Sequence, residues 1–409
     1  MTPTLLLQLI ISILLLSYIL DTVLSYLNAR QFNAPLPEEL RDVYDEAAYT
    51  KSQRYKLEKY KFSMLTGVLS FIAILFFFYV EGFAFLDHLA RSLSTNETVI
   101  TLIFFGFIFI GSDLLNTPFS YYNTFYIEEK YGFNKMTKGL FFMDKLKGLF
   151  LTLVVGGTLL TVIHLFYQYT KTDFWWYTWI LIAVFSLLMS LFYSTWIVPL
   201  FNKQTPLPEG SLRDKLGALA KKVDFQLDQI FVIDGSKRST KANAYFTGFG
   251  KKKRIVLYDT LINDLTEEEI VAVLAHEVGH YKRKHVLLTM FLSIGLTGFT
   301  LYILSLLISS ELLANALSVQ LPSFHIGLIA FGLLYSPISE ITGLLMNILS
   351  RTFEYQADAF AKEYVGASPL ISGLKKLARN SFSNLTPHPA YVFMHYSHPT
   401  LLQRIRAMA

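Results

Sequence analysis

The stretch Thr266 to His285 reads TEEEIVAVLAHEVGHYKRKH, and the rest of the chain is interpreted around it. It contains His276, Glu277 and His280 in the order H-E-x-x-H. Because residues i and i+4 of a helix lie on one face, the two imidazoles would converge on one point, and the glutamate beside the first would reach that point from the side. The pattern therefore predicts a zinc site with its own general base.

The residues around the motif favour the helix that it requires. Thr266 followed by Glu269 is a capping box, further acids occupy the first turn, and a run of basic residues ends the segment at Lys284. No proline interrupts the segment before the motif. A chance occurrence of five residues is the alternative, and a third metal ligand elsewhere in the chain would distinguish the two.

A candidate third ligand lies in SRTFEYQADAFAKEYVG, residues Ser350 to Gly366. Glu354 and Asp358 stand at i and i+4 on a predicted helix that ends at the glycine. Glu354 would complete a His, His, Glu set with one position left open for water. Asp358 would accept the free N–H of a ligating histidine. The alternative for this acidic pair is an ordinary solvated helix face, but the H-E-x-x-H helix favours ligation.

The composition predicts an α-helical multi-pass membrane protein. Of 409 residues 53% are hydrophobic and 15% aromatic, and the mean hydropathy is +0.40. With no cysteine, the chain forms no disulfides and offers no thiolate ligand. Seven apolar runs are long enough to span a bilayer: residues 4–27, 64–86, 98–117, 148–168, 175–198, 286–309 and 325–349.

The placement of positive charge predicts the orientation. Of the 36 lysine and arginine residues, 34 fall in alternate segments between the spans. Positive residues remain cytoplasmic, so we expect the N-terminus outside and the C-terminus in the cytosol. Because lipid headgroups and this rule explain the basic segments, we expect the lipid bilayer as a partner and no nucleic acid.

The spans divide the chain into four predicted parts. These are five transmembrane helices (1–198), a cytosolic zinc-peptidase insertion (199–285), two more transmembrane helices (286–349) and a cytosolic tail (350–409). Within the insertion, residues 211–223 have the pattern of an amphipathic helix. Short β-like runs follow at QIFVIDG, ANAYFTGFG and KRIVLYDTL. A small sheet before an H-E-x-x-H helix is typical of zinc peptidases, whose edge strand holds an extended substrate.

Several blocks together give the chain a family resemblance. HEVGH (276–280), RTFEYQAD (351–358), KANAYF (241–246), KSQRY, IEEKYGFNK and the terminal SHPTLLQRI (397–405) resemble type I CAAX prenyl proteases over essentially the whole chain. The resemblance implies seven transmembrane helices around a water-filled chamber, with a small α+β zincin-type (gluzincin) domain on the cytosolic side. It also implies one zinc per chain and a peptide or protein substrate.

Residue by residue, the resemblance assigns roles to the matching positions. It implies that zinc is bound by His276, His280 and Glu354 and that Glu277 is catalytic. It places Asn243 and Ala244 in the strand that pairs with substrate. It also places His398 and Arg404 in a terminal H-P-x-x-x-x-R block beside the site, where His398 would be catalytic and Arg404 would bind substrate.

The substrate and the source follow from the same resemblance. Family members cleave near the C-terminus of prenylated CAAX proteins, and some act in membrane-protein quality control without needing a prenyl group. This chain lacks the longer insertions of eukaryotic family members, so we expect a bacterial protein in the inner membrane. A eukaryotic member would lie in the endoplasmic reticulum membrane.

Some polar residues admit two interpretations. Either His398 or Tyr391 could stabilise the oxyanion, although Ser397-His398-Pro399 is also a good helix start. His285, His388 and His395 are expected to be surface or packing histidines. Within the spans, Asp113 and Glu340 should face the bundle interior or water.

Two other function classes would also accommodate seven spans. A transporter or channel explains intramembrane acids but gives no reason for a capped H-E-x-x-H helix followed by E-x-x-x-D. An inactive scaffold of peptidase origin should have lost Glu277 or a ligand, and all are present. We therefore expect a membrane zinc metalloendopeptidase.

Overall fold

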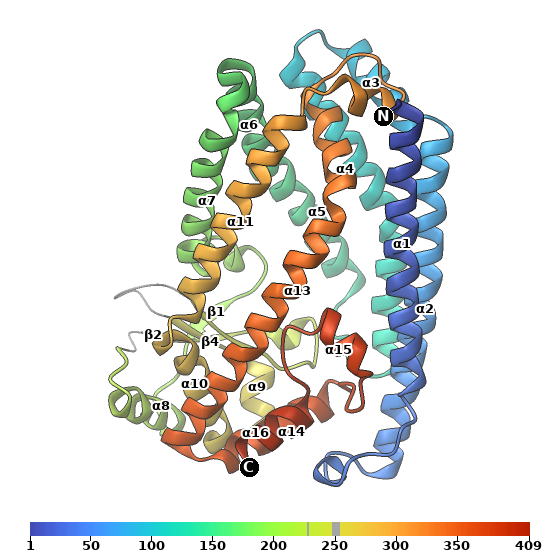
Figure 1. Cartoon of the computed structure of the whole chain (residues 1–409). Coiled ribbons are helices and arrows are strands. Elements are labelled where there is room, and N and C mark those ends of the chain that lie inside the picture. Colours follow the sequence, from blue (N-terminus) through green and yellow to red (C-terminus); the bar gives the residue numbers. More distant parts are fainter. Residues whose placement is uncertain (227–228, 248–253) are drawn as a thin grey trace.

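The computed structural model describes residues 1–226, 229–247 and 254–409. Its long helices lie roughly along one axis, and most of the short elements, including the strands, gather at one end of them, whereas α3 lies at the other end (Figure 1). The long helices are α1 (Pro3–Arg30), α2 (Glu46–Tyr79), α4 (Glu97–Tyr122), α5 (Lys138–Leu151), α6 (Gly157–Thr170), α7 (Phe174–Trp196), α11 (His285–Leu307) and α13 (Phe324–Val365). The shorter helices are α3 (Gly82–Leu93), α8 (Ser211–Lys222), α9 (Asp259–Asp264), α10 (Glu267–Lys282), α12 (Glu311–Ala316), α14 (Ala367–Asn380), α15 (Pro389–His395) and α16 (Leu401–Met408).

Helices long and apolar enough to cross a membrane occur in six segments of the described chain. One of them, Lys138–Leu200, has 63 residues and contains two of the expected spans. The chain reverses at a short 3-10 turn over Lys171–Asp173, where Lys171 has φ +50°, and α6 then packs against α7. The termini lie at opposite ends of the long helices, as an odd number of crossings requires (Figure 1).

One predicted span boundary is wrong, and the predicted helix that carries Glu354 and ends at Gly366 is confirmed. The second span, expected at 64–86, ends at Tyr79, because Glu81 takes a left-handed φ of +51° and α3 starts a new direction at Gly82. The last span, expected at 325–349, belongs to a continuous helix of 42 residues that ends at Val365. One helix therefore connects the apolar bundle directly to the candidate ligand Glu354.

The predicted strands form a small sheet beside α10. Strands β1 (Gln204–Pro206), β2 (Gln229–Ile233), β4 (Arg254–Tyr258) and β3 (Ala244–Thr247) occur in that order across it. β2 and β4 are parallel, and the two outer pairs are antiparallel. The predicted strands and the helix over 211–223 are confirmed. The last three residues of the run ANAYFTGFG (248–250) and the first residue of KRIVLYDTL lie outside the described residues.

Helices α10 and α13 pack so closely at Gly279 that a side chain there would crowd α13. A Cβ added at Gly279 would lie 3.1 Å from both Ala357 Cα and Phe360 Cβ. The close approach aligns the motif helix with the helix that carries Glu354. The other side of α10 packs Ile270, Leu274 and Val278 into a core with sheet residues.

The two intramembrane acids of the sequence analysis have polar partners. Lys145 Nζ lies 2.8 Å from Asp113 Oδ1. Glu340 Oε1 accepts a hydrogen bond of 2.7 Å from Ser17 on α1. Both contacts join one transmembrane helix to another, which offsets part of the cost of an acid at membrane depth.

Candidate metal centre

Helix α10 presents two imidazole nitrogens to the same point. The predicted capping box is present at its start, where Thr266 Oγ1 accepts from Glu269 N–H and the Glu269 carboxylate accepts from Thr266 N–H. One turn apart near its end, His276 Nε2 and His280 Nε2 lie 3.1 Å from each other. His276 is buried and His280 is partly exposed. The pair thus has the geometry that the i, i+4 spacing predicts.

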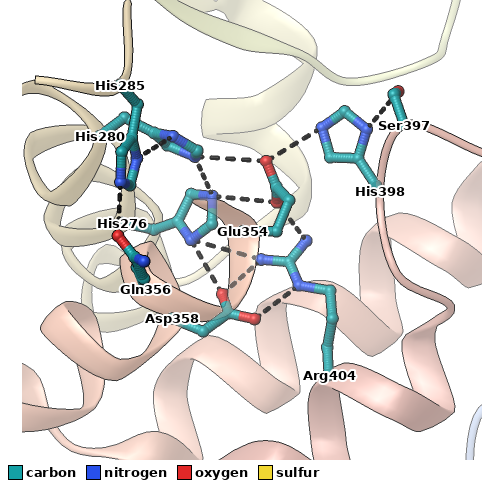
Figure 2. A network of polar contacts seen from close by, with 9 residues as sticks. All are labelled: His276, His280, His285, Glu354, Gln356, Asp358, Ser397, His398 and Arg404. Carbon is teal, nitrogen blue, oxygen red and sulfur yellow. Dashed lines mark hydrogen bonds and ion pairs between the residues drawn. The ribbon is translucent and has the colours of Figure 1, made fainter. Parts of the chain in front are cut away.

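Glu354 of α13 completes the group (Figure 2). Its two carboxylate oxygens lie 3.4 Å from His276 Nε2 and 3.3 Å from His280 Nε2. Zinc bonds of about 2.0–2.1 Å at tetrahedral angles place ligand atoms about 3.3 Å apart, so the spacing fits a bound ion. Glu354 Oε2 is buried without a hydrogen-bond partner among the described residues, which is a second sign that a cation belongs there.

Asp358 and Arg404 hold the first histidine. Asp358 Oδ1 lies 2.8 Å from His276 Nδ1, the position predicted for it. Arg404 from α16 donates to both oxygens of Asp358, at 2.8 and 2.5 Å, and its Nη1 lies 3.5 Å from Glu354 Oε2. Arg404 is buried, so in this structure its contacts are with the site itself. The predicted contact between Arg404 and substrate stays a prediction.

The surroundings of His276 raise its affinity for a proton. Burial lowers the pKa of its imidazole, but the nearby carboxylates of Asp358 and Glu354 outweigh burial and raise the pKa to about 9. The same acceptors would favour any other cation at this position. A metal ion therefore competes with a proton for His276.

His398 lies on the solvent side of the centre. Its Nε2 is 3.3 Å from Glu354 Oε1, and its side chain is 62% exposed. Helix α16 begins after Thr400, whose side chain provides the N-cap, so His398 does not cap this helix. Tyr391 instead contacts the rings of His395 and Tyr396. Between the two candidates for oxyanion stabilisation, only His398 has a contact with a ligand in the described structure.

Glu277 lies on α10, and the predicted substrate strand β3 packs beside the same helix. Glu277 is partly exposed. Burial lowers the pKa of the Arg404 guanidinium, but the carboxylates of Asp358, Glu354 and Glu277 outweigh burial and raise it. On β3, Phe246 packs against Tyr281, the residue that follows His280. Asn243 is exposed, and its Oδ1 accepts from Ala244 N–H at 2.9 Å.

His285 is a packing histidine, one of the two expectations for it, because its ring stacks on Phe353, and it also contacts a candidate ligand. It is 4% exposed, and its Nδ1 lies 3.1 Å from His280 Nδ1. Its spacing of five residues from His280 does not match a helical face, so periodicity gave no signal for it. His388 and His395 have no contact with the ligands: His388 caps α15, and His395 lies 3.7 Å from Asp21.

Comparisons with known proteins agree with this geometry. Residues 25–203 match the profile described as CAAX prenyl protease N-terminal, five membrane helices, and residues 206–409 match peptidase family M48. The CAAX prenyl protease 1 homolog of Oryza sativa is 37% identical, with 98% of this chain and 97% of that protein covered. The chain is a CAAX prenyl protease 1 family member. It is a membrane metalloendopeptidase of the M48 family.

Other proteins similar to this chain are eukaryotic and of similar length. CAAX prenyl protease 1 of Saccharomyces cerevisiae is 36% identical, with 94% of this chain and 91% of that protein covered. The crystal structure of S. mikatae Ste24p has a TM-score of 0.93 and 34% identity, with 98% of this chain and 99% of that chain covered. Since the rice protein is covered almost completely, the absence of long insertions does not separate this chain from eukaryotic members. A bacterial origin stays a prediction.

Proposed function

We propose that this family member is a zinc endopeptidase that cleaves prenylated CAAX proteins near their C-terminus. The observation that carries the proposal is the cluster of ligand atoms from His276, His280 and Glu354: the two Nε2 atoms lie 3.1 Å apart, and each lies 3.3 to 3.4 Å from one oxygen of the Glu354 carboxylate. The relatives named above supply the substrate class through their name, CAAX prenyl protease 1. Zinc is proposed over other metals because two imidazoles and one carboxylate with an open position form a catalytic zinc set.

The proposed chemistry divides between the metal and the chain. Zinc bound by the three ligands would lower the pKa of a water molecule to about 7 and polarise the scissile carbonyl. Glu277, beside the first ligand, takes the proton of the attacking water and passes it to the leaving amine. His398, exposed at the edge of the centre, donates to the oxyanion of the tetrahedral intermediate. Asp358, held by Arg404, accepts from His276 Nδ1–H and keeps Nε2 available for the metal.

The edge strand β3 supports a mode of substrate binding. Tyr258 N–H donates to Asn243 O, so residues 243 and 245 direct their backbone groups toward β4. The alternation then directs the N–H of Ala244 toward the free edge, where the Asn243 side chain accepts from it. We propose that an extended peptide replaces this local bond and pairs with the edge. Pairing through backbone groups provides affinity without sequence preference.

The bilayer would supply the rest of the recognition. A prenyl chain in apolar surroundings contributes about 0.8 kcal/mol for each buried CH₂. We propose that the metal centre faces the cytosol and the N-terminus lies on the other side, because lysine and arginine are concentrated in the segments at the end of the bundle that carries the centre. The membrane is the endoplasmic reticulum in a eukaryotic source and the inner membrane in a bacterial one.

The test compares a farnesylated CAAX peptide with an unmodified peptide of the same sequence. Purified wild-type protein should contain one zinc per chain and cleave the farnesylated peptide faster. Glu354→Ala should lose zinc, whereas Glu277→Gln should keep zinc and lose about 10²- to 10⁴-fold in kcat. Equal cleavage of both peptides would contradict the prenyl requirement and favour a quality-control protease. Full zinc content and activity in Glu354→Ala would contradict the metal site.

A further inference from the structure

The second candidate metal ligand, His280, contacts a series of further side chains, first His285 and then Gln356. His285 Nδ1 lies 3.1 Å from His280 Nδ1, and on the other side of the ring His285 Nε2 lies 2.9 Å from Gln356 Oε1 (Figure 2). The His285 ring stacks on Phe353, with centroids 4.1 Å apart and planes 8° apart. His285 is thus held on both ring nitrogens and on one face.

If His280 binds a metal through Nε2, the donor and the acceptor of each hydrogen bond in this series of side chains are fixed. To bind a metal through Nε2, a neutral His280 must carry its proton on Nδ1. His285 Nδ1 must then accept that proton's hydrogen bond, so His285 carries its own proton on Nε2. The oxygen of Gln356 accepts from that N–H. The reverse direction would place the proton of His280 on Nε2, where it would block the metal.

The backbone between the two helices brings His285 to this position. In an uninterrupted helix, residues five apart point about 140° away from each other. Here α10 ends at Lys282, and Lys284 takes a left-handed conformation with φ +59° and ψ +26° before α11 starts. Few residues other than glycine, asparagine and aspartate adopt this conformation. The turn it makes lets His285 fold back against His280.

We infer that His285 and Gln356 form a relay that fixes the tautomer and ring orientation of His280, which makes them positioning residues for the metal centre. The inference rests on the metal site of the proposed function. It assigns to His280 what Asp358 and Arg404 provide for His276. The two relays differ in charge, because one ends on a carboxylate paired with a guanidinium and the other ends on a neutral amide.

The test measures the release of Zn²⁺ from purified holoprotein to a chromogenic chelator. Gln356→Met keeps the size of the side chain and removes the acceptor, so it should release zinc about tenfold faster, within the 10- to 100-fold range for partners of ligating histidines. Gln356→Glu keeps an acceptor and cannot donate, so it should release zinc no faster than wild type. His285→Asn, which retains an amide acceptor near the Nδ1 position, should release zinc more slowly than His285→Phe.

Matched controls separate the relay from general damage and from the metal site itself. Gln53→Met removes the hydrogen bond that Gln53 Nε2 on α2 donates to Phe32 O. This bond involves none of the metal-centre residues, so the variant should leave the release rate unchanged. The thermal midpoint of each metal-free variant reports the fold. A Gln356→Met rate equal to wild type, or a Gln356→Glu rate equal to Gln356→Met, would overturn the relay. Zinc retained by Glu354→Ala would instead overturn the metal site on which the relay rests.

Discussion

Individual side chains at the metal centre act through atoms that the sequence pattern does not mention. Arg404 is the clearest example, because the resemblance assigned it to substrate and the structure pairs it with Asp358. A guanidinium that holds a carboxylate in two bonds fixes the carboxylate in a plane, and the carboxylate fixes the imidazole. The role of His276 therefore depends on Arg404, the residue that holds its hydrogen-bond partner Asp358.

Replacing Arg404 by lysine tests this role. Lysine keeps the charge that pairs with Asp358 but cannot form the two parallel bonds, so the orientation of His276 should relax. We expect zinc affinity and kcat/KM to fall together by about 10- to 100-fold. Zinc titration and peptide cleavage on the same preparation provide the measurement. Unchanged zinc affinity with a raised KM would show that Arg404 contacts substrate instead.

The raised pKa of His276 predicts a pH dependence for the metal-free protein and for zinc binding. A folded-state pKa of about 9, above the ordinary value of 6.5, stabilises the metal-free protein below pH 6.5, and this stabilisation is lost as pH rises toward 9. Because zinc must displace that proton, its affinity should rise about tenfold for each pH unit up to about 9. Calorimetry in buffers of different ionisation enthalpy should detect the released proton. Affinity independent of pH between 6.5 and 8.5 would contradict this account.

At the scale of elements, the site depends on the distance between α10 and α13. One helix supplies both histidines and the other supplies Glu354 and Asp358, so a small separation of the two helices changes the distances from Glu354 to both histidines. The contact at Gly279 determines how closely they approach. The glycine of HEVGH therefore belongs to the packing of the site.

Gly279→Ala should weaken both the fold and the metal centre. Its Cβ would meet the backbone of α13 at 3.1 Å, and overpacking of this kind costs about 1–3 kcal/mol of unfolding free energy. Zinc affinity should fall about tenfold, measured beside the thermal midpoint. Gly217→Ala on α8 is the matched control, since nothing lies within 4 Å of its Cβ and the alanine should be neutral or stabilising. Full zinc affinity in Gly279→Ala would show that the helices can separate without effect on the ligands.

The edge strand β3 offers a second test at this scale. Ala244→Pro removes a backbone donor that the sheet does not use, so zinc should stay bound while cleavage falls to near zero. Tyr245→Pro is the control, because the alternation directs that N–H to β4 and its loss should unfold the sheet. Normal cleavage in Ala244→Pro would rule out pairing at this position. Loss of zinc in Ala244→Pro would show that the strand serves the fold alone.

At the scale of the whole molecule, α13 joins the membrane to the metal centre. It runs from the apolar bundle to Glu354 and Asp358 without a break, and the small sheet and α14 to α16 surround its far end (Figure 1). A substrate anchored in the bilayer would therefore meet the centre through elements that the bundle itself positions. Such an arrangement suits a peptide with one apolar and one polar end.

Orientation in the membrane is testable by labelling, because the chain has no cysteine. Thr95→Cys, between α3 and α4, should react with a membrane-impermeant maleimide that is added to sealed right-side-out vesicles. Lys237→Cys, beside the sheet, should react only after permeabilisation. Both positions are exposed. The opposite pattern would reverse the predicted topology and move the metal centre to the outer face.

The sequence alone determined the features that depend on local periodicity. The H-E-x-x-H spacing predicted two converging histidines, the capping box predicted the start of their helix, and E-x-x-x-D predicted a ligand and its neighbour on one later helix. The apolar runs predicted the membrane segments, including the pair within Lys138–Leu200. Each of these follows from which residues share a helical face or a length of chain.

Only the tertiary structure decided the features that depend on where the backbone turns and which helices meet. A left-handed residue at Glu81 ends a helix that the apolar pattern would continue, and another at Lys284 places His285 against His280. The binding of Arg404 to Asp358 joins residues 46 positions apart. Such contacts arise when helices pack against each other, and no local pattern encodes which side chains then come within hydrogen-bond distance.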